Sequence, residues 1–307
     1  MSYLKLFRFR NLLMILLIQY LIRYCIIIPT LDEYNQKPLL NDFFFFLLAF
    51  SCVLVSAAGY AINDYFDLRI DRINKPDKII LGRKISRRQA IFFHSFFNIL
   101  GVLLAAFVSI KVHLLRLSAI HIIAITLLWF YAIYYKRRFL IGNIIISLLT
   151  SLVVLTIWLF EFWPRYIVTH DTFDYSTVRI VILIYAGFAF LTTLIREIIK
   201  DIQDIEGDKK VGCKTLPVIW GIEKAKYFVV VLIILLIIAI VYIQDLFWKY
   251  ESILFLLYSF IFIQIPYILV IFKTIQAKNK KHFVFLNLFT KLIMLMGVLS
   301  LLIMFFK

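Results

Sequence analysis

The sequence predicts an all-α polytopic membrane protein with nine transmembrane helices. Of its 307 residues, 63% are hydrophobic and 17% are charged, whereas soluble domains are about half apolar and about a quarter charged. Apolar stretches of about 20 residues, the length of helix that crosses a bilayer core, recur nine times along the chain. Disorder is excluded, because disordered chains are poor in aliphatic and aromatic residues.

The nine expected spans follow one another over a single domain, 1–307. They lie near residues 11–30, 40–62, 89–110, 113–135, 139–160, 178–196, 225–244, 252–272 and 283–306. Very short polar connections join the third span to the fourth and the fourth to the fifth, which favours helical hairpins. Gln19 and Arg23 interrupt the first apolar run and no small-residue cleavage site follows, so a retained helix is expected rather than a signal peptide. The three cysteines have no paired or metal-like spacing, which indicates neither disulfides nor zinc.

The basic residues are concentrated in a few connecting segments. The chain carries 34 Lys and Arg against 18 Asp and Glu, a formal net charge of +16. By our assignment, 25 of the 34 lie in the N-terminus and in segments 63–88, 136–138, 196–226 and 273–282. By the positive-inside rule these segments are cytoplasmic, and so is the N-terminus. We expect a multi-pass protein of the cell membrane whose basic side attracts anionic lipids or substrates, with no nucleic acid and no obligate protein partner.

Two carboxylate motifs stand out on the side expected to be cytoplasmic. Both read D-x-x-D-x-x-x-D, and they comprise Asp64, Asp67 and Asp71, and Asp201, Asp204 and Asp208. On a helix these spacings put three carboxylates on one stripe, where they repel one another unless a cation offsets their charge. Oxygen ligands without nearby His or Cys favour Mg²⁺, which also binds substrate phosphates. The motifs therefore predict a magnesium and diphosphate site.

The repetition of the motif predicts an internal duplication. Each motif caps the end of a span, the second and the sixth, so the motif recurs at an interval of four spans. We therefore expect two four-helix pseudo-repeats that deliver both stripes to one cytoplasmic mouth. The alternative, a solvated loop of alternating charge, explains one such motif more readily than two.

The motif segments resemble the two signature loops of the UbiA-type intramembrane prenyltransferases. The matching stretches are NDYFDLRIDRINKPDK and REIIKDIQDIEGDKKVGCKTLPVIWG. The resemblance implies a bundle with a central cavity, in which Mg²⁺ and the aspartates hold a polyprenyl diphosphate. The INKP and EGD…KTLP patterns are similar to the digeranylgeranylglyceryl phosphate synthase branch of that family. Where that pattern has Arg-Pro and Ser-Gly, this chain has Lys78-Ile79 and Leu81-Gly82.

The resemblance also implies roles for individual residues. The expected metal ligands are Asn63, Asp67 and Asp71, with Asp204 and Asp208, joined on the same stripes by Asp64 and Asp201. The expected catalytic cations, which neutralise the leaving diphosphate, are Lys136, Arg72, Lys78, Arg196 and Lys200. Glu197 is expected to join the site, the alternative being a lone ion pair with Arg196 or Lys200.

Four further residues are expected to contact substrate. Tyr131, Lys136 and the pair Gly142-Asn143 are similar to a Tyr…Lys…Gly-Asn segment of the family. A tyrosine ring there can stabilise an allylic cation; the alternative for Tyr131 is an aromatic belt at the membrane interface. Asn11 resembles a family asparagine near the substrate. Arg23 lies inside the first span, where a charge needs a polar partner, and it either joins the site or forms a separate pair.

The expected activity is Mg²⁺-dependent transfer of a polyprenyl group, geranylgeranyl by the resemblance, from its diphosphate to a lipophilic acceptor. The favoured acceptor is the hydroxyl of a prenylglyceryl phosphate. Prenylation of an aromatic ring, a hydroxybenzoate or a naphthoate, stays open as an alternative. A cation transporter is the remaining alternative, although transporter sites normally lie near the bilayer midplane.

Overall fold

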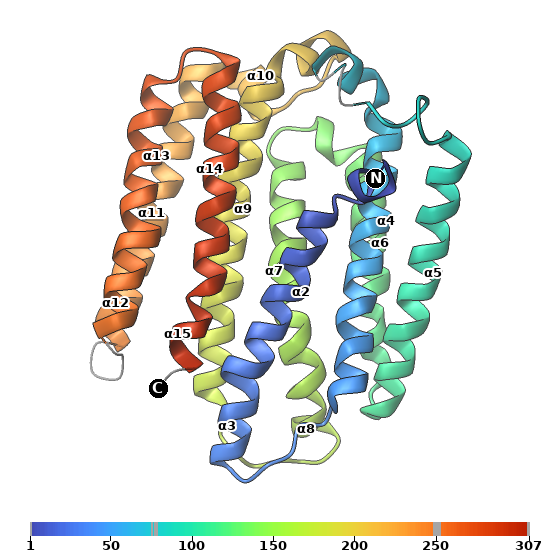
Figure 1. The fold of residues 1–307 in the computed structure, drawn as a ribbon, viewed down its shortest axis with the longest axis vertical. Coiled ribbons are helices and arrows are strands. Elements are labelled where there is room, and N and C mark those ends of the chain that lie inside the picture. Colours follow the sequence, from blue (N-terminus) through green and yellow to red (C-terminus); the bar gives the residue numbers. More distant parts are fainter. Residues whose placement is uncertain (1, 75, 77–78, 248–252, 306–307) are drawn as a thin grey trace. The chain divides into compact units, whose positions relative to one another are not determined.

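The computed structural model describes residues 2–74, 76, 79–247 and 253–305, and these are overwhelmingly helical (Figure 1). Within this part of the chain, nine helical segments are long and apolar enough to cross a membrane. They run over Phe9–Glu33, Asp42–Asn74, Arg87–Lys111, Leu115–Ile133, Ile141–Ile167, Ser176–Val211, Ile222–Asp245, Ile253–Gln276 and Lys280–Ile303. The nine predicted spans are therefore confirmed.

The chain divides into two compact units. The first comprises residues 1–136 and 151–186, and the second comprises 137–150 and 187–307. The first unit holds α1 (Ser2–Leu6), α2 (Phe9–Ile22), α3 (Ile28–Glu33), α4 (Asp42–Asn74), α5 (Arg87–Lys111), α6 (Ala119–Ile133) and α8 (Trp163–Ile167). The second holds α10 (Leu216–Trp220), α11 (Ile222–Phe247), α12 (Ile253–Ser259), α13 (Ile265–Gln276), α14 (Lys280–Leu299) and α15 (Leu301–Phe305). Two helices contribute to both units, α7 (Ile141–Glu161) and α9 (Ser176–Val211).

The two motif-bearing helices are longer than the spans predicted for them. The predicted spans ended at residues 62 and 196, whereas α4 continues to Asn74 and α9 to Val211. Beyond residue 62, α4 still buries Leu68 and Ile70. Beyond residue 196, α9 still buries Ile198, Ile199 and Ile202. Because these apolar residues keep the helices packed, the carboxylate motifs are carried on rigid helix rather than on loops.

Helices α4, α5 and α6 form the packed centre of the first unit, and a glycine sets the approach of α5 to α4. A Cβ atom at Gly101 of α5 would lie 2.9 Å from Val55 Cγ2 and 3.3 Å from the carbonyl oxygen of Ser51. Small residues let membrane helices approach this closely. The start of α5 is fixed by a capping box, in which Ser86 Oγ accepts from the Gln89 amide and Gln89 Oε1 accepts from that of Ser86.

Replacing Gly101 with alanine is expected to lower the free energy of unfolding by about 1–3 kcal/mol, because the added methyl overpacks the interface between α4 and α5. Gly187 of α9 is the matched control, since a Cβ atom there meets nothing within 4 Å. Gly187→Ala should be neutral or stabilising, because alanine favours helix by about 1 kcal/mol over glycine. Thermal unfolding of both variants in one detergent measures the difference. Equal destabilisation would contradict the packing argument.

A buried ion-pair network of the first unit lies beside the start of α4, at the opposite end of that helix from the carboxylate motif. Glu161, which is 2% exposed, accepts from the backbone amides of Leu39 and Leu40 at 2.7 and 3.3 Å. Arg165 donates to Glu161 at 2.9 Å and lies 3.7 Å from Asp171. The Tyr175 hydroxyl donates to Asp171 at 2.8 Å. Burial, with this hydrogen bond, raises the pKa of Tyr175 to about 12.

In the second unit, α9 packs through a continuous apolar face. Its buried residues Leu194, Ile195, Ile198, Ile199 and Ile202 join one core with residues from α10, α11, α13 and α14. The spacing of three and four residues places them on one stripe of the helix. The carboxylates of the second motif follow on the same helix.

Candidate active site

Asn63 and Asp67 form the buried centre of the first motif. They lie one turn apart on α4, are 6% and 5% exposed, and are joined by a hydrogen bond from Asn63 Nδ2 to Asp67 Oδ2 of 2.8 Å. Asp71 lies one turn further along and is half-buried. The helix thus carries the predicted carboxylates, and Asn63, which the resemblance adds to them, is already hydrogen-bonded to Asp67.

Lys136 supplies the charge that balances Asp67. Its Nζ donates to Asp67 Oδ2 and lies 3.4 Å from Asn63 Oδ1. Burial alone would lower the pKa of Lys136, but the negative charge of Asp67 outweighs this and holds the pKa above its ordinary value. Tyr131, which is buried near the end of α6, also interacts electrostatically with Lys136. The structure therefore places Lys136 and Tyr131 beside the first motif, and their roles toward substrate stay predictions.

Arg8 is a residue of this cluster that the sequence pattern does not identify. Its Nη2 donates to Asp64 Oδ1 at 2.9 Å, and its guanidinium lies 4.8 Å from the centre of the Tyr60 ring. Asn11 donates to the Tyr60 hydroxyl at 3.2 Å, which places this predicted residue beside the same ring. Arg8 reaches Asp64 because it breaks α1 from α2 in a left-handed conformation, with φ 49° and ψ 52°. Such a conformation costs free energy for a residue other than glycine. In the sequence, the basic N-terminus is the only feature that indicates a role for Arg8.

In the second unit, Asn143 and Glu197 flank the second motif. Asn143 Nδ2 donates to Asp201 Oδ2 at 2.8 Å, which joins α7 to α9. Glu197, 5% exposed, forms ion pairs with both Arg196 and Lys200, the latter at 3.0 Å. Both ion pairs named as the alternative for Glu197 are thus present, and its role toward substrate stays a prediction.

Asp204 and Asp208 are held by polar residues that the motif alone does not predict. Gln203 Nε2 donates to Asp204 Oδ1 at 3.1 Å, and its Oε1 accepts from Asn287 of α14 at 3.2 Å. Thr215 Oγ1 donates to Asp208 Oδ2 at 3.3 Å. Asp208 is 6% exposed. The only sequence feature that indicates Gln203 and Thr215 as partners of these carboxylates is their place within the segments that resemble the family loops.

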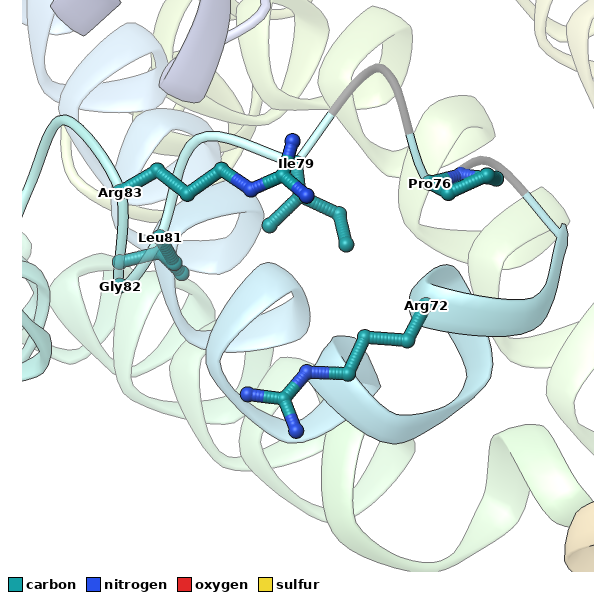
Figure 2. A pocket seen from close by; sticks show the side chains of 6 residues that line it. All are labelled: Arg72, Pro76, Ile79, Leu81, Gly82 and Arg83. Carbon is teal, nitrogen blue, oxygen red and sulfur yellow. The ribbon is translucent and has the colours of Figure 1, made fainter.

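Of three other predicted residues, Arg23 lies apart from these clusters, Arg72 adjoins the first one on α4, and Lys78 lies outside the described part. Arg23 is 2% exposed and donates to the carbonyl oxygen of Leu40 at 2.8 Å and to Asp42 at 3.0 Å, at the start of α4. Since 21 residues of helix separate Asp42 from Asn63, Arg23 lies about 30 Å from the first cluster. Arg72, near the end of α4 (Figure 2), is exposed and directly follows Asp71; on an ideal helix it lies about 140° around α4 from Asp67 and about 100° from Asp71. Lys78 lies outside the residues that the structure describes.

The oxygen donors of both motifs fit Mg²⁺. Among the described residues, no group of three His, Cys, Asp or Glu side chains forms a ready-made metal cage. Mg²⁺ is ordinarily bound by one or two carboxylates together with substrate phosphates. The buried Asn63–Asp67 pair supplies such a donor set, and Asp201, Asp204 and Asp208 supply another.

The charge of Lys136 is expected to be constant over the neutral pH range. The pKa of Lys136 is raised in the folded state, so the stabilisation that its charge gives the fold is complete below about pH 10.4, the pKa of lysine in the unfolded chain. This stabilisation is lost only as the pH rises above that value. The difference in unfolding free energy between the wild type and Lys136→Met should therefore stay constant from about pH 7 to about pH 9. Chemical denaturation at each pH measures it. A marked decrease in this difference between about pH 7 and about pH 9 would show that Lys136 titrates in that range.

The chain is similar to known membrane prenyltransferases. A model of the UbiA prenyltransferase family matches residues 34–303. A digeranylgeranylglyceryl phosphate synthase of Methanosphaera stadtmanae is 32% identical over 258 residues, which cover 83% of this chain and 85% of that protein. A solved structure of digeranylgeranylglyceryl phosphate synthase is 29% identical, with a TM-score of 0.67 over 100% of this chain and 98% of that one. A UbiA homologue of Archaeoglobus fulgidus bound to GPP and Mg²⁺ shares the fold, with 18% identity and a TM-score of 0.56 over 98% and 99% of the two chains.

Proposed function

Because this chain belongs to the UbiA prenyltransferase family, we propose that it transfers a prenyl group, geranylgeranyl by preference, from its diphosphate to the hydroxyl of a prenylglyceryl phosphate. The observation that carries the proposal is the buried Asn63–Asp67 pair, with Lys136 donating to Asp67. Similarity to digeranylgeranylglyceryl phosphate synthases over most of the chain supports this choice of acceptor. The chain is an integral multi-pass membrane enzyme, and we propose that residues 1–307 act as one domain.

Asn63, Asp64, Asp67 and Asp71, with Asp201, Asp204 and Asp208, are the residues we propose to hold Mg²⁺. When bound, Mg²⁺ neutralises the diphosphate and makes it a better leaving group. The A. fulgidus homologue solved with GPP and Mg²⁺ supports this requirement. We propose that both carboxylate sets serve the same reaction.

Lys136 is the residue that we propose to act on the leaving group. Its Nζ already bonds to the carboxylate that we assign to the metal, so it lies within reach of a diphosphate held there. The C1–oxygen bond of the prenyl diphosphate breaks, and the diphosphate departs with the electron pair. A fixed cation near that oxygen stabilises the charge that develops. The buried Tyr131 ring is positioned to stabilise positive charge on the prenyl carbon.

The remaining cations and amides take supporting roles in the proposal. Arg196, Lys200 and Glu197 form one ion-paired group beside the second motif. Asn143 orients Asp201, and Asn11 acts through Tyr60. We propose that the acceptor hydroxyl attacks C1, forms the ether bond and loses its proton to solvent.

The proposed orientation places the N-terminus and both motifs in the cytoplasm. The assignment rests on the concentration of 25 of the 34 Lys and Arg in segments on that side. Cysteine labelling of a single-cysteine variant at the exposed Lys209 position, with a membrane-impermeant reagent, tests it. Labelling in inside-out vesicles, and not in intact cells, is the expected result.

The acceptor is tested with the purified protein in lipid vesicles. Labelled geranylgeranyl diphosphate is supplied with geranylgeranylglyceryl phosphate in one reaction and with 4-hydroxybenzoate in another. Product is expected only in the first reaction, and only when Mg²⁺ is present. Product only with the aromatic acceptor would overturn the proposed acceptor while leaving the prenyltransferase assignment intact.

A further inference from the structure

Helix α14 runs antiparallel beside the part of α9 that belongs to the second unit. Near the end of α14, a Cβ atom at Gly297 would collide with the ring of Phe188, which lies early in α9. Ten residues earlier on α14, Asn287 Nδ2 donates to Oε1 of Gln203, which lies late in α9, at 3.2 Å. The two helices are therefore in contact at both places, and the second contact is a hydrogen bond beside the second carboxylate motif.

Asn287 is a half-buried polar residue at the edge of an apolar stripe. The buried residues of this stripe recur every three or four positions along α14, and they include Phe283, Leu286 and Ile293. These three share one core with apolar residues of α9. Polar side chains in membrane helices generally face the interior of the bundle and pair there. The partner of Asn287 is Gln203, which is 7% exposed.

The two amides and the carboxylate of Asp204 form a chain of hydrogen bonds, which we call the amide relay. Gln203 Nε2 donates to Asp204 Oδ1 at 3.1 Å, while Gln203 Oε1 accepts from Asn287. An ionised carboxylate only accepts hydrogen bonds, so Gln203 must turn its amino group toward Asp204 and its carbonyl oxygen toward α14. Asn287 must then present its own amino group. The orientation of the Gln203 amide therefore depends on a donor at position 287.

We propose that Asn287 and Gln203 are positioning residues for the second metal-binding set, a role that rests on the function proposed above. Partners that hydrogen-bond to a metal-ligating carboxylate set its orientation and tune its affinity for the metal. Gln203 holds Asp204 in this way, and Asn287 holds Gln203. A carboxylate that is oriented before the metal arrives loses less conformational freedom on binding. Helix α14, which carries none of the expected ligands, thereby contributes to the site.

Asn287→Asp separates this role from a simple effect of charge, because the two predict changes of opposite sign. Aspartate is nearly the size of asparagine but, when ionised, it has no donor. The Gln203 amide is then expected to turn its amino group toward position 287 and its carbonyl oxygen toward Asp204. Asp204 would lose a donor and face an acceptor, so its affinity for the metal should fall. Added negative charge near the site would by itself raise that affinity.

The chain offers a matched control for this change. Asn279→Asp makes the same substitution at the exposed residue that caps the start of α14, and aspartate caps a helix as well as asparagine does. Gln203→Met removes the central amide of the relay and keeps the approximate length of the side chain. Gln203→Met/Asn287→Asp tests whether Asn287 acts through Gln203.

The experiment uses the full-length protein in a neutral detergent. Mn²⁺, which favours the same oxygen ligands as Mg²⁺, is titrated at a fixed concentration of geranylgeranyl thiolodiphosphate, an unreactive analogue of the prenyl donor. The EPR signal of free Mn²⁺ gives the bound fraction. The rate of prenyl transfer is measured separately against Mg²⁺ concentration, and thermal unfolding shows that each variant is folded.

The wild type and Asn279→Asp are expected to bind Mn²⁺ equally well. Gln203→Met should bind it about 10- to 100-fold more weakly, and Asn287→Asp about 10-fold more weakly, as for other losses of a partner to a metal ligand. The Mg²⁺ concentration that gives half the maximal rate should rise by the same factors, while the rate at saturating Mg²⁺ changes less. In the Gln203→Met background, Asn287→Asp should weaken Mn²⁺ binding no further.

Three results would overturn the proposal. They are unchanged or tighter Mn²⁺ binding by Asn287→Asp, equal losses in Asn287→Asp and Asn279→Asp, and a further loss in the double variant. Mn²⁺ affinities that change as expected, in a protein that transfers no prenyl group, would instead contradict the proposed function and leave the positioning role intact. If Asn287→Asp does not fold, Asn287→Leu removes the donor without adding a charge and should also weaken Mn²⁺ binding.

Discussion

Replacing Asp67 with asparagine is expected to lower kcat for prenyl transfer by about 100- to 1,000-fold. Asp67 is buried, is oriented by Asn63 and is the carboxylate to which Lys136 donates. Asparagine keeps the size of the side chain but removes the negative charge that holds the metal and the lysine. The measurement is product formation at saturating substrate, with Mg²⁺ varied in the same series.

Two companion variants separate catalysis from folding. Asp32→Asn changes an exposed carboxylate of α3 in the same unit and should leave kcat unchanged. Asp67→Asn/Lys136→Met removes both members of the pair, so it should recover part of the stability lost in the single variant, with no recovery of activity. If the double variant regained activity, Asp67 would serve only to neutralise Lys136.

Glu161→Leu is expected to lower the free energy of unfolding by about 3–5 kcal/mol, the usual cost of breaking a buried ion pair by removing one of its members. Glu161 and Arg165 are 2% and 4% exposed. The carboxylate also accepts the amides of Leu39 and Leu40, so its loss leaves two further donors unsatisfied. Equilibrium unfolding of the purified protein in detergent measures the change.

The control for this prediction is Glu33→Leu, at an exposed position of α3. That change should cost less than about 1 kcal/mol, as surface substitutions generally do. Glu161→Leu/Arg165→Met should be more stable than the single variant, because the buried guanidinium that lost its nearest carboxylate is removed as well. If both substitutions lower the free energy of unfolding equally, the ion-pair network does not stabilise the connection between α3 and α4.

The nine spans could be predicted because crossing a bilayer imposes a strong and simple constraint on composition. The ends of α4 and α9 could not, because hydropathy falls at residues 62 and 196 while the helices continue. Their continuation depends on tertiary burial of Leu68 and Ile198, which a hydropathy window does not register. The π-helical turns at Arg23–Ile27 and Phe260–Gln264 also leave no compositional trace.

The candidate site was predictable where residue type and spacing carry the chemistry, as in the helical stripe of Asp64, Asp67 and Asp71. It was not predictable where a partner comes from a distant segment. Arg8 reaches Asp64 across 56 residues of sequence, and Asn287 reaches Gln203 across 84. Arg72 shows the opposite case: it adjoins the motif in sequence, yet the rotation of 100° per residue turns it away from Asp67. Proximity along a helix and proximity in space are different quantities.

The length of α4 links the chemistry to the physical state of the bilayer. Its 33 residues form a rod of about 50 Å, whereas the hydrocarbon core is about 30 Å thick. Only its apolar part, residues 42–62 and about 30 Å long, is matched to that core, and a helix whose apolar part exceeds the local core thickness tilts as the bilayer becomes thinner. Since Asn63 and Asp67 are part of that rod, the tilt sets how far they stand above the acyl chains that hold the substrate's tail. Lipid chain length thereby becomes a determinant of substrate alignment, acting through hydrophobic mismatch.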